Sequence, residues 1–514
     1  MKRAIIAGGA FATVVVLLAL AAGRRAREQD VDPAAAASPA IDPSTAAAQT
    51  AASEEAHQGF LYGRIHTVVG ATYEGRLRWG GDEEAFWGDY FNGFKDENPW
   101  AAHVPLERLP TERRPIEILG FEIAHRERPI DLGRFFMARF GDIARIEARG
   151  FDDVGVTLKS GTVFDLDRLS AGDFDDGVRV WDRRRGVVDL DSRLIRTIEL
   201  LPTARLDAAP DRLHGTVRVR QGEFTGFVQW HREACVGSDE LDGDTASGEL
   251  GLRFDAIRSI ARRSRDSALV TLLDGSEIVL SGTREVGHGH RGVYVDDRRY
   301  GRVLVSWDAF ERIDFSPGGS GPAHGDFPPG RPLTGSVTTR AGRRLAGRLV
   351  YDLDESETTE TLDAPSQGVD YTIPFGLIAS IVVPGREERG ARRASVTLQS
   401  GEELQLELTG DLGPGNAGVL IFVDGGQRPE YVPWTEVEQV DFDGPAAAGP
   451  QGRLAGLPLL VAPVVPRGWR RSTTAPTGRA GAPPSPPPTS AADRRRGLLP
   501  HRHHRYRLGR QIEA

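Results

Sequence analysis

The chain has 514 residues, of which 39% are hydrophobic and 27% are charged, and its formal net charge is −9. This length exceeds that of one ordinary domain, and the composition is that of a folded body with less ordered additions. The acidic balance excludes a generally basic nucleic-acid binder. The single cysteine, Cys235, excludes an internal disulfide framework and a CxxC metal site.

The N-terminus has the features of an export segment. Two cations precede the apolar run 4–22, and three arginines follow it closely. A basic start, an apolar stretch and small residues are typical of a signal peptide, although this run is also long enough to span a bilayer. We therefore interpret residues 1–27 as a signal peptide or an uncleaved membrane anchor. Residues 28–58, which are rich in Ala, Ser, Thr and Pro, are predicted to be a disordered linker.

A first motif recurs three times in the body of the chain. It reads Leu-x-Gly-x-(Ile/Val), then a glycine turn, then Gly-x-(Leu/Val)-x-(Trp/Tyr), and it occupies residues 61–79, 213–230 and 333–351. Alternating apolar residues on both sides of a glycine-containing turn predict a β-hairpin. A repeated motif of this length indicates repeated structural units. We therefore expect three tandem β modules, at 59–201, 210–316 and 331–443, the first with an aromatic insertion at 80–139.

A second motif consists of an aromatic residue followed, at a spacing of three, by two apolar residues. It begins at Phe140, Phe254 and Phe375, and it returns near the module ends at Trp307 and Trp434. In the first module Ser192 replaces the tryptophan. The spacing places the side chains on one side of a short 3₁₀ turn.

Taken together, the two motifs resemble tandem SH3-like and Sm-like small β-barrel repeats in an exported bacterial protein. In those barrels a 3₁₀ turn precedes the final strand. The resemblance implies an all-β fold of three modules, each built of two small barrel-like halves. The second signature motif of Sm proteins has no convincing counterpart in this chain, so RNA binding is not carried over.

No catalytic signature is present in the sequence. It lacks HExxH, G-x-S-x-G, a Walker loop and a Cys–His signature. We therefore expect no catalytic residues, no organic cofactor and no enzymatic activity.

The strongest local signal is acidic, because carboxylates follow each predicted opening hairpin. They are Asp82, Glu83 and Glu84, then Asp239, Glu240 and Asp242, then Asp352, Asp354 and Glu355. Carboxylate oxygens are the ligands that Ca²⁺ prefers, so three calcium-binding loops are one hypothesis. Solvated acidic loops and a glycosidase carboxylate pair are the alternatives.

The insertion in the first module is rich in aromatic residues. They are Phe86, Trp87, Tyr90, Phe91 and Trp100. Aromatic side chains among Gly, Asp and Asn can bind a partner or a glycan. They can equally form part of the core.

The C-terminal residues 444–514 differ in character from the body. From residue 450 onward there are 12 arginines, no lysine and 2 acids, so the tail carries about +10 and the rest of the chain about −19. We interpret this segment as a disordered Arg/Pro-rich tail or as the product of a frameshift.

The sequence therefore predicts an exported, non-catalytic β-repeat protein, periplasmic or extracellular, that acts as an envelope-associated binding or scaffolding module. Its expected partner is an envelope protein or a polysaccharide, with no nucleic-acid partner and with membrane contact only through the N-terminal segment. One alternative is a glycan or cell-wall hydrolase that uses the acidic loops. Sm-like RNA binding is a second alternative, which conflicts with export and with the acidic body.

Overall fold

The computed structural model describes residues 57–79, 84–95, 98–109, 111–118, 121–129, 134–150, 153–168, 174, 177–206, 209–282, 284–385, 393–423, 426 and 428–444. The described residues all lie in one of the two units into which the chain divides. The predicted export segment, nearly all of the predicted linker and the Arg/Pro-rich tail after Gly444 lie outside the described residues, as do Asp82 and Glu83.

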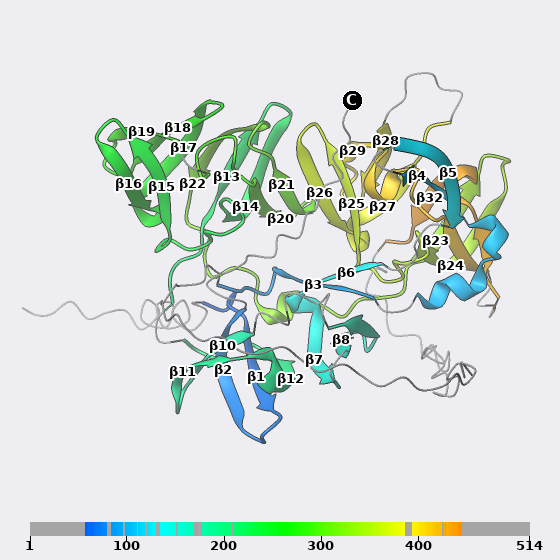
Figure 1. Cartoon of the computed structure of the whole chain (residues 1–514), viewed down its shortest axis with the longest axis horizontal. Coiled ribbons are helices and arrows are strands. Elements are labelled where there is room, and N and C mark those ends of the chain that lie inside the picture. Colours follow the sequence, from blue (N-terminus) through cyan, green and yellow to red (C-terminus); the bar gives the residue numbers. More distant parts are fainter. Residues whose placement is uncertain are drawn as a thin grey trace, which may run out of the picture. The chain divides into compact units, whose positions relative to one another are not determined.

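The described part of the chain is all-β, as the sequence predicts, with short 3₁₀ turns between strands (Figure 1). Most strands of segment 1 (residues 59–201) form one eight-stranded sheet in the order β11-β10-β2-β1-β12-β7-β8-β9. Its strands are β1 (Tyr62–Thr67), β2 (Thr72–Trp79), β7 (Ile143–Arg149), β8 (Asp153–Leu158), β9 (Val163–Asp167), β10 (Val178–Asp182), β11 (Gly186–Leu190) and β12 (Ile195–Leu200).

The insertion of segment 1 forms two separate two-stranded sheets. In one, β3 (Tyr90–Phe94) pairs with β6 (Phe135–Arg139). In the other, β4 (Thr111–Ile118) pairs with β5 (Phe121–Pro129). The 3₁₀ turns η1 (Pro99–His103) and η2 (Leu106–Arg108) lie between β3 and β4.

Segment 2 (residues 210–316) contributes ten strands to a twelve-stranded sheet, and segment 3 (residues 331–443) contributes two. The order is β16-β15-β19-β18-β17-β22-β13-β14-β20-β21-β26-β25. The strands are β13 (His214–Val219), β14 (Gly222–Gln229), β15 (Glu240–Thr245), β16 (Gly248–Arg253), β17 (Ile257–Ser264), β18 (Ser267–Leu272), β19 (Glu277–Ser281), β20 (Val293–Asp297), β21 (Gly301–Val305), β22 (Phe310–Phe315), β25 (Thr361–Ser366) and β26 (Val369–Pro374).

The rest of segment 3 forms a second eight-stranded sheet in the order β29-β28-β27-β32-β23-β24-β30-β31. The strands are β23 (Thr334–Thr339), β24 (Arg344–Tyr351), β27 (Ile378–Val382), β28 (Arg393–Leu398), β29 (Glu403–Glu407), β30 (Val419–Val423), β31 (Glu430–Val432) and β32 (Val437–Phe442).

Five of the predicted 3₁₀ turns occur where the second motif places them, whereas the motif at Trp307 forms an ordinary turn that leads into β22. The five are η3 (Phe140–Asp142), η4 (Ser192–Leu194), η5 (Phe254–Ala256), η7 (Phe375–Leu377) and η9 (Trp434–Glu436). In η3, η5 and η7 the leading phenylalanine is buried and the next apolar residue begins a strand, as a spacing of three requires. Two further turns, η6 (His324–Asp326) and η8 (Gly410–Leu412), lie outside the motif.

The barrel-like halves expected from the sequence are replaced by open sheets. The reason lies in the last strand of each segment. In segment 1, β12 pairs with β1 on one side and with β7 on the other, so the two halves merge into one continuous sheet and neither half closes on itself.

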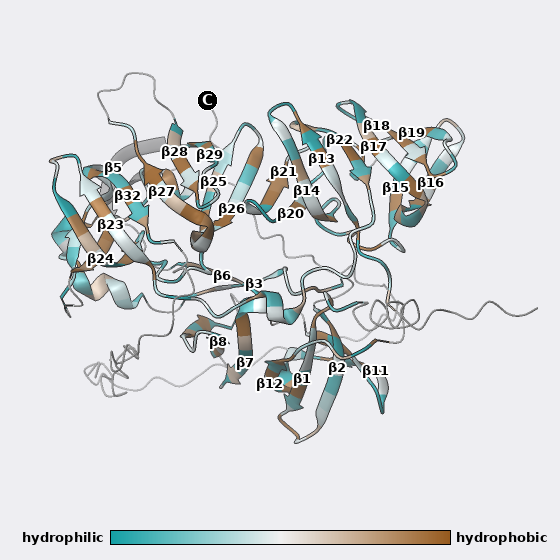
Figure 2. Ribbon diagram, turned by 180° about the vertical axis from the view of Figure 1, so that it is seen from behind, coloured by the Kyte–Doolittle hydropathy of each residue, from teal (hydrophilic) through white to brown (hydrophobic). Residues whose placement is uncertain are grey.

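Apolar and polar residues alternate along many strands (Figure 2), and the apolar ones fill two large cores. One core lies in segment 1, and the other is shared by segments 2 and 3. Phe327, which precedes segment 3 in the chain, belongs to the core of segment 1 and lies against Gly141. Segment 1 is therefore tied to the residues that connect segments 2 and 3.

The glycine that opens the second half of each hairpin motif is required by close backbone approach. A Cβ atom on Gly75 or Gly226 would lie 1.9 Å from the carbonyl oxygen of Trp181 or Asp296, respectively. Gly347 occupies the same place in the third hairpin, with a corresponding distance of 2.2 Å to the backbone of β30. Real Cβ atoms do not approach a carbonyl oxygen so closely. The glycine of the motif therefore marks the position where β2, β14 and β24 pair with β10, β20 and β30, respectively.

Replacing Gly226 with alanine should therefore separate β14 from β20. Overpacking of this kind costs about 1–3 kcal/mol, which urea unfolding of Gly226→Ala would measure. Gly222 begins the same strand, and a Cβ atom there meets nothing within 4 Å. Gly222→Ala is therefore the matched control, and equal stability of the two variants would contradict the close-approach explanation.

Candidate functional site

The described residues line a partly open acidic cavity of about 160 Å³ between the insertion of segment 1 and segment 3. Six carboxylates line it, together with two cations and a short run of β6. The acidic residues are Asp352, Asp354, Glu355, Glu360, Asp363 and Asp411, the cations are Lys95 and Arg134, and the β6 residues are Phe135, Phe136 and Met137.

A tight turn after β24 places the first carboxylates at the cavity. Asp352 and Leu353 have φ values of 51° and 54°, and the backbone N–H groups of Asp354 and Glu355 both donate to the carbonyl of Tyr351. This reversal directs consecutive acidic residues into one small volume. The Asp352 carboxylate accepts hydrogen bonds from the backbone N–H of Ala417 and from Arg134, the latter at 3.2 Å.

Lys95 carries the central positive charge of the site. Its ammonium group lies 2.6 Å from Asp354 Oδ1 and 3.5 Å from Glu360 Oε1, and the residue is 8% exposed. Burial alone would lower the pKa of Lys95, but the Asp354 and Glu360 carboxylates outweigh it and raise that pKa. Lys95 therefore stays charged throughout the physiological pH range.

The other carboxyl groups of the cavity hold their protons unusually strongly. Burial raises the pKa of Asp352 to about 7 and the pKa of Asp363 to about 6. The pKa values of Glu355 and Asp411 are raised well above the usual range, first by burial and then by neighbouring carboxylates. Six acids face two cations, so the cavity is stable only if several of these carboxyls are neutral or further positive charge is present.

Glu355 is the least satisfied acid of the group. Its Oε2 atom is buried and has no hydrogen-bond partner among the described residues. Asp411, by contrast, accepts the backbone N–H of Asp363 at 2.6 Å. Glu360 accepts the backbone N–H groups of Ser356 and Glu357. Most of the site is thus a hydrogen-bonded structural network, and the Glu355 Oε2 atom is the part of it without a hydrogen bond among the described residues.

Of the three acidic loops predicted from the sequence, only the third lines this cavity. Glu84 of the first loop is partly buried and pairs with Arg76 at 3.5 Å. In the second loop, Asp239 accepts the backbone N–H groups of Cys235 and Val236, while Glu240 and Asp242 lie on β15. The three loops therefore do not converge on one site in the described residues.

The aromatic residues of the insertion contact other parts of the same chain. Phe86, Trp87 and Phe91 are fully buried. Of the two interpretations that the sequence left open, these three residues therefore belong to the core and do not form a binding surface. Tyr90 is partly buried, and its ring lies 5.0 Å from the guanidinium of Arg302.

Trp100 is the other partly buried aromatic residue, and it packs on segment 3. Its ring centroid lies 6.1 Å from that of Phe422. Nearby, Val104 and Leu109 of the insertion join an apolar cluster with Leu353 and Leu420. The insertion is thus attached to segment 3 by apolar contacts as well as by charges.

Sequence reasoning missed Lys95, Arg134, Glu360, Asp363 and Asp411. One signal was available, because the chain has 3 lysines among its 64 cations. Lys95 and Lys159 are the two within the body, and both make specific polar contacts. Lys159 donates to the carbonyl oxygens of His324 and Phe327 at 2.7 and 3.1 Å.

Comparison of the chain with protein-family models, with curated proteins and with solved structures finds no match. Among the described residues, no helix is long and apolar enough to cross a membrane. Within the same residues, no group of three or more His, Cys, Asp or Glu side chains has an arrangement that could hold a metal ion.

Replacing Lys95 with methionine tests the central ion pair. Removing one partner of a buried pair leaves an uncompensated charge and costs about 3–5 kcal/mol, so urea unfolding of Lys95→Met should show a loss of that size. Arg343 pairs with Glu430 at 2.7 Å on the surface, where both side chains are about half exposed. Arg343→Met should cost less than about 1 kcal/mol, and an equal loss in both variants would contradict the central role of Lys95.

The pH dependence of stability tests the raised carboxyl pKa values. In the folded protein these carboxyl groups keep protons that they release near pH 4 in the unfolded chain. Their contribution to stability is therefore complete below about pH 4. The contribution is lost as the pH rises through the pKa values of the folded state, which include about 7 for Asp352. We therefore expect the free energy of unfolding, and with it the melting temperature, to fall from about pH 4 up to about pH 7. The free energy should fall by up to about 1.4 kcal/mol per pH unit for each proton released.

The variant Glu355→Gln should reduce this slope and raise stability at pH 8, because it removes an acid that must otherwise ionise in the cavity. The exposed Asp274, whose carboxylate accepts from its neighbour Ser276, provides the control Asp274→Asn. A slope that is the same in the wild type and in Glu355→Gln would refute the assignment.

Proposed function

We propose that this chain is an exported, non-catalytic β-repeat protein that acts as a binding or scaffolding module of the cell envelope. The proposed partner is an envelope protein or a polysaccharide, and the proposed location is periplasmic or extracellular. Export rests on the N-terminal sequence, which lies outside the described residues.

The repeat organisation is part of this proposal. Its support is the agreement in strand order among the three segments. In each one the first strand of the opening hairpin lies between its hairpin partner and the last strand of the segment. The registers also agree, since Gly63 faces Leu200, Gly215 faces Phe315 and Gly335 faces Phe442.

The observation that carries the proposed function is that buried charges pair with one another across the segments. Lys95 and Arg134 of segment 1 pair with acids of segment 3. Arg302 of segment 2 lies 2.8 Å from Asp89 of segment 1. Such internal pairing fixes the segments to one another and engages these charged side chains within the chain, as a scaffold requires.

The cavity is also small for a substrate site. Ligand pockets usually have volumes of about 300–1,000 Å³, whereas the acidic cavity has about 160 Å³, so the proposed partner binds elsewhere on the surface. The glycan-hydrolase alternative draws on one observation, namely that the Glu355 and Asp411 carboxyls have raised pKa values, as a general acid does.

A single assay distinguishes these two functions. The purified chain is incubated with a panel of cell-envelope polysaccharides and envelope protein fractions, and co-sedimentation and the release of reducing ends are both measured. We expect binding without release of reducing ends, and unchanged binding by Glu355→Gln. Release of reducing ends that disappears in a folded Glu355→Gln variant would establish the hydrolase instead, and absence of binding throughout the panel would overturn the proposal.

Calcium binding by the acidic loops remains a separate hypothesis from the sequence. Ca²⁺ would supply the positive charge that the six acids around the cavity call for. It is tested by thermal unfolding with and without millimolar CaCl₂, with MgCl₂ as the control for ionic strength. A Ca²⁺-specific rise in melting temperature that is lost in Glu355→Gln would support it, and an unchanged melting temperature would dismiss it.

A further inference from the structure

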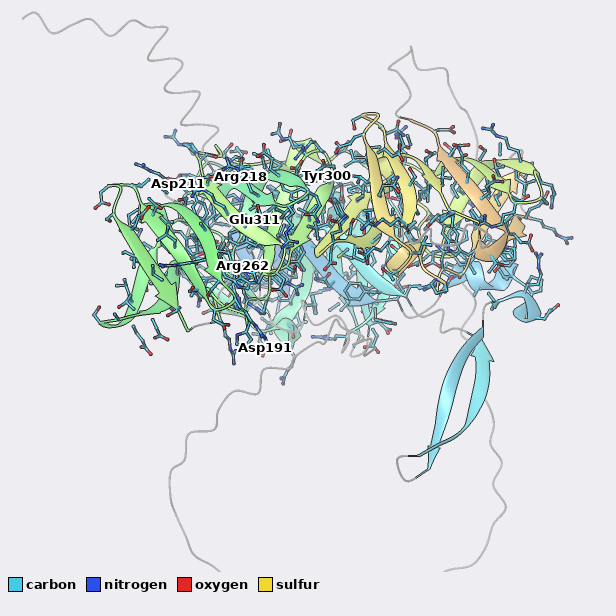
Figure 3. All side chains as sticks on the ribbon, turned by 90° about the horizontal axis from the view of Figure 1, so that it is seen from above. Asp191, Asp211, Arg218, Arg262, Tyr300 and Glu311 are labelled. Carbon is cyan, nitrogen blue, oxygen red and sulfur yellow. The ribbon has the colours of Figure 1, made fainter. Side chains whose placement is uncertain are left out.

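Segments 2 and 3 are joined edge to edge in one sheet. The last strand of segment 2 in this sheet, β21, pairs antiparallel with β26 of segment 3, and Val303 faces Tyr371 in this register. Side chains reinforce the joint. Tyr300, labelled in Figure 3, packs at 5.8 Å from the Tyr371 ring and donates a hydrogen bond to Glu402 at 2.5 Å.

The same two kinds of strand occur elsewhere in the chain with free edges. β11 of segment 1 corresponds to β21, because each ends a β-hairpin and begins with a glycine at positive φ, Gly186 at 75° and Gly301 at 87°. β16 of segment 2 corresponds to β26, because each directly precedes a 3₁₀ turn that begins with phenylalanine, at Phe254 and Phe375.

Both of these strands end their sheets (Figure 1). Among the described strands, β11 pairs only with β10, and β16 pairs only with β15. Both are largely exposed, and Val187, the second residue of β11, is 56% exposed. An exposed strand edge presents unpaired N–H and C=O groups that another strand can complete.

We propose that β11 of one chain pairs with β16 of a second copy, in the register in which β21 pairs with β26. This inference rests on the proposed repeat organisation and deepens the scaffold function, because it names the partner as another copy of the same chain. Transferring the register places Val187 opposite Gly251 and Val188 opposite Leu250. Asp189 faces Glu249, and its charge is already neutralised by Arg179 at 2.6 Å.

The proposed contact is heterologous, since it joins two different edges. A contact of this kind either closes into a ring or continues as an open row of copies. Either outcome yields an assembly held by the same kind of joint as the one between segments 2 and 3, which is consistent with the proposed scaffold function.

Sedimentation velocity of the full chain over a wide concentration range tests the contact. We expect the weight-average mass to rise from 55.8 kDa to at least twice that value. Val187→Lys should stay monomeric, because a charge on an edge strand opposes pairing. Val163 lies on β9, at the opposite end of the same sheet, and is 47% exposed, so Val163→Lys is the matched control and should associate like the wild type.

Cysteine pairing tests the register. Chains carrying Val187→Cys are mixed with chains carrying Gly251→Cys under mild oxidation, while Cys235 remains buried. We expect a disulfide-linked dimer at a yield several-fold above that of a mixture of Val163→Cys and Gly251→Cys.

Three results would overturn the inference: a monomer at every concentration, equal association of Val187→Lys and the wild type, or equal cross-linking in both cysteine mixtures. Each would leave the proposed envelope binding standing, since the co-sedimentation assay reads that function independently. Conversely, association together with a failure of envelope binding would retain the contact between copies and remove the proposed function.

Discussion

One buried ammonium group holds together the part of the molecule where its segments meet. Lys95 lies between Asp354 and Glu360, with almost no access to solvent. A charge in that position must be paired, and a pair in that position fixes the distance between the insertion of segment 1 and the start of segment 3. The charge state of the neighbouring acids depends on this contact, and the docking of the insertion depends on it together with the Arg134–Asp352 pair and the apolar cluster around Leu353.

The structure shows where part of the negative charge of the chain lies. Part of its excess negative charge lies in a cavity where burial raises the pKa values of Asp352 and Asp363 toward neutrality. The acids therefore do not act as a uniformly negative surface. In the cavity, bound protons together with Lys95 and Arg134 neutralise the negative charge of the acids.

Edges are the second organising feature of the fold. A barrel would have removed them by closure, but the last strand of each segment pairs on both sides and leaves open sheets instead. Open sheets end in strands with unsatisfied backbone groups. Segments 2 and 3 satisfy two of these edges with each other through β21 and β26. The remaining edges are the natural positions for contacts beyond the chain.

Local regularities of the fold could be predicted from the sequence, because they depend on neighbours in the chain. The hairpins follow from alternation around glycine turns, and the 3₁₀ turns follow from a spacing of three after Phe140, Phe254 and Phe375. Three acidic loops were identified from the sequence on equal terms, and only the third lines the cavity. The aromatic insertion was recognised, although its burial could not be distinguished from exposure by composition alone.

The sequence by itself determined the all-β class, the recurring hairpins and turns, and the positions of the acidic loops, since each depends on residues a few places apart. Only the tertiary structure decided that the sheets stay open, that β26 joins β21, and that Lys95 meets acids about 260 residues away in the chain. Pairing of strand edges and pairing of buried charges are both set by which surfaces meet in space. The local sequence does not determine these pairings, because all open strand edges, like all acidic loops, have similar chemistry. Which edge or acid is paired depends on how the segments pack.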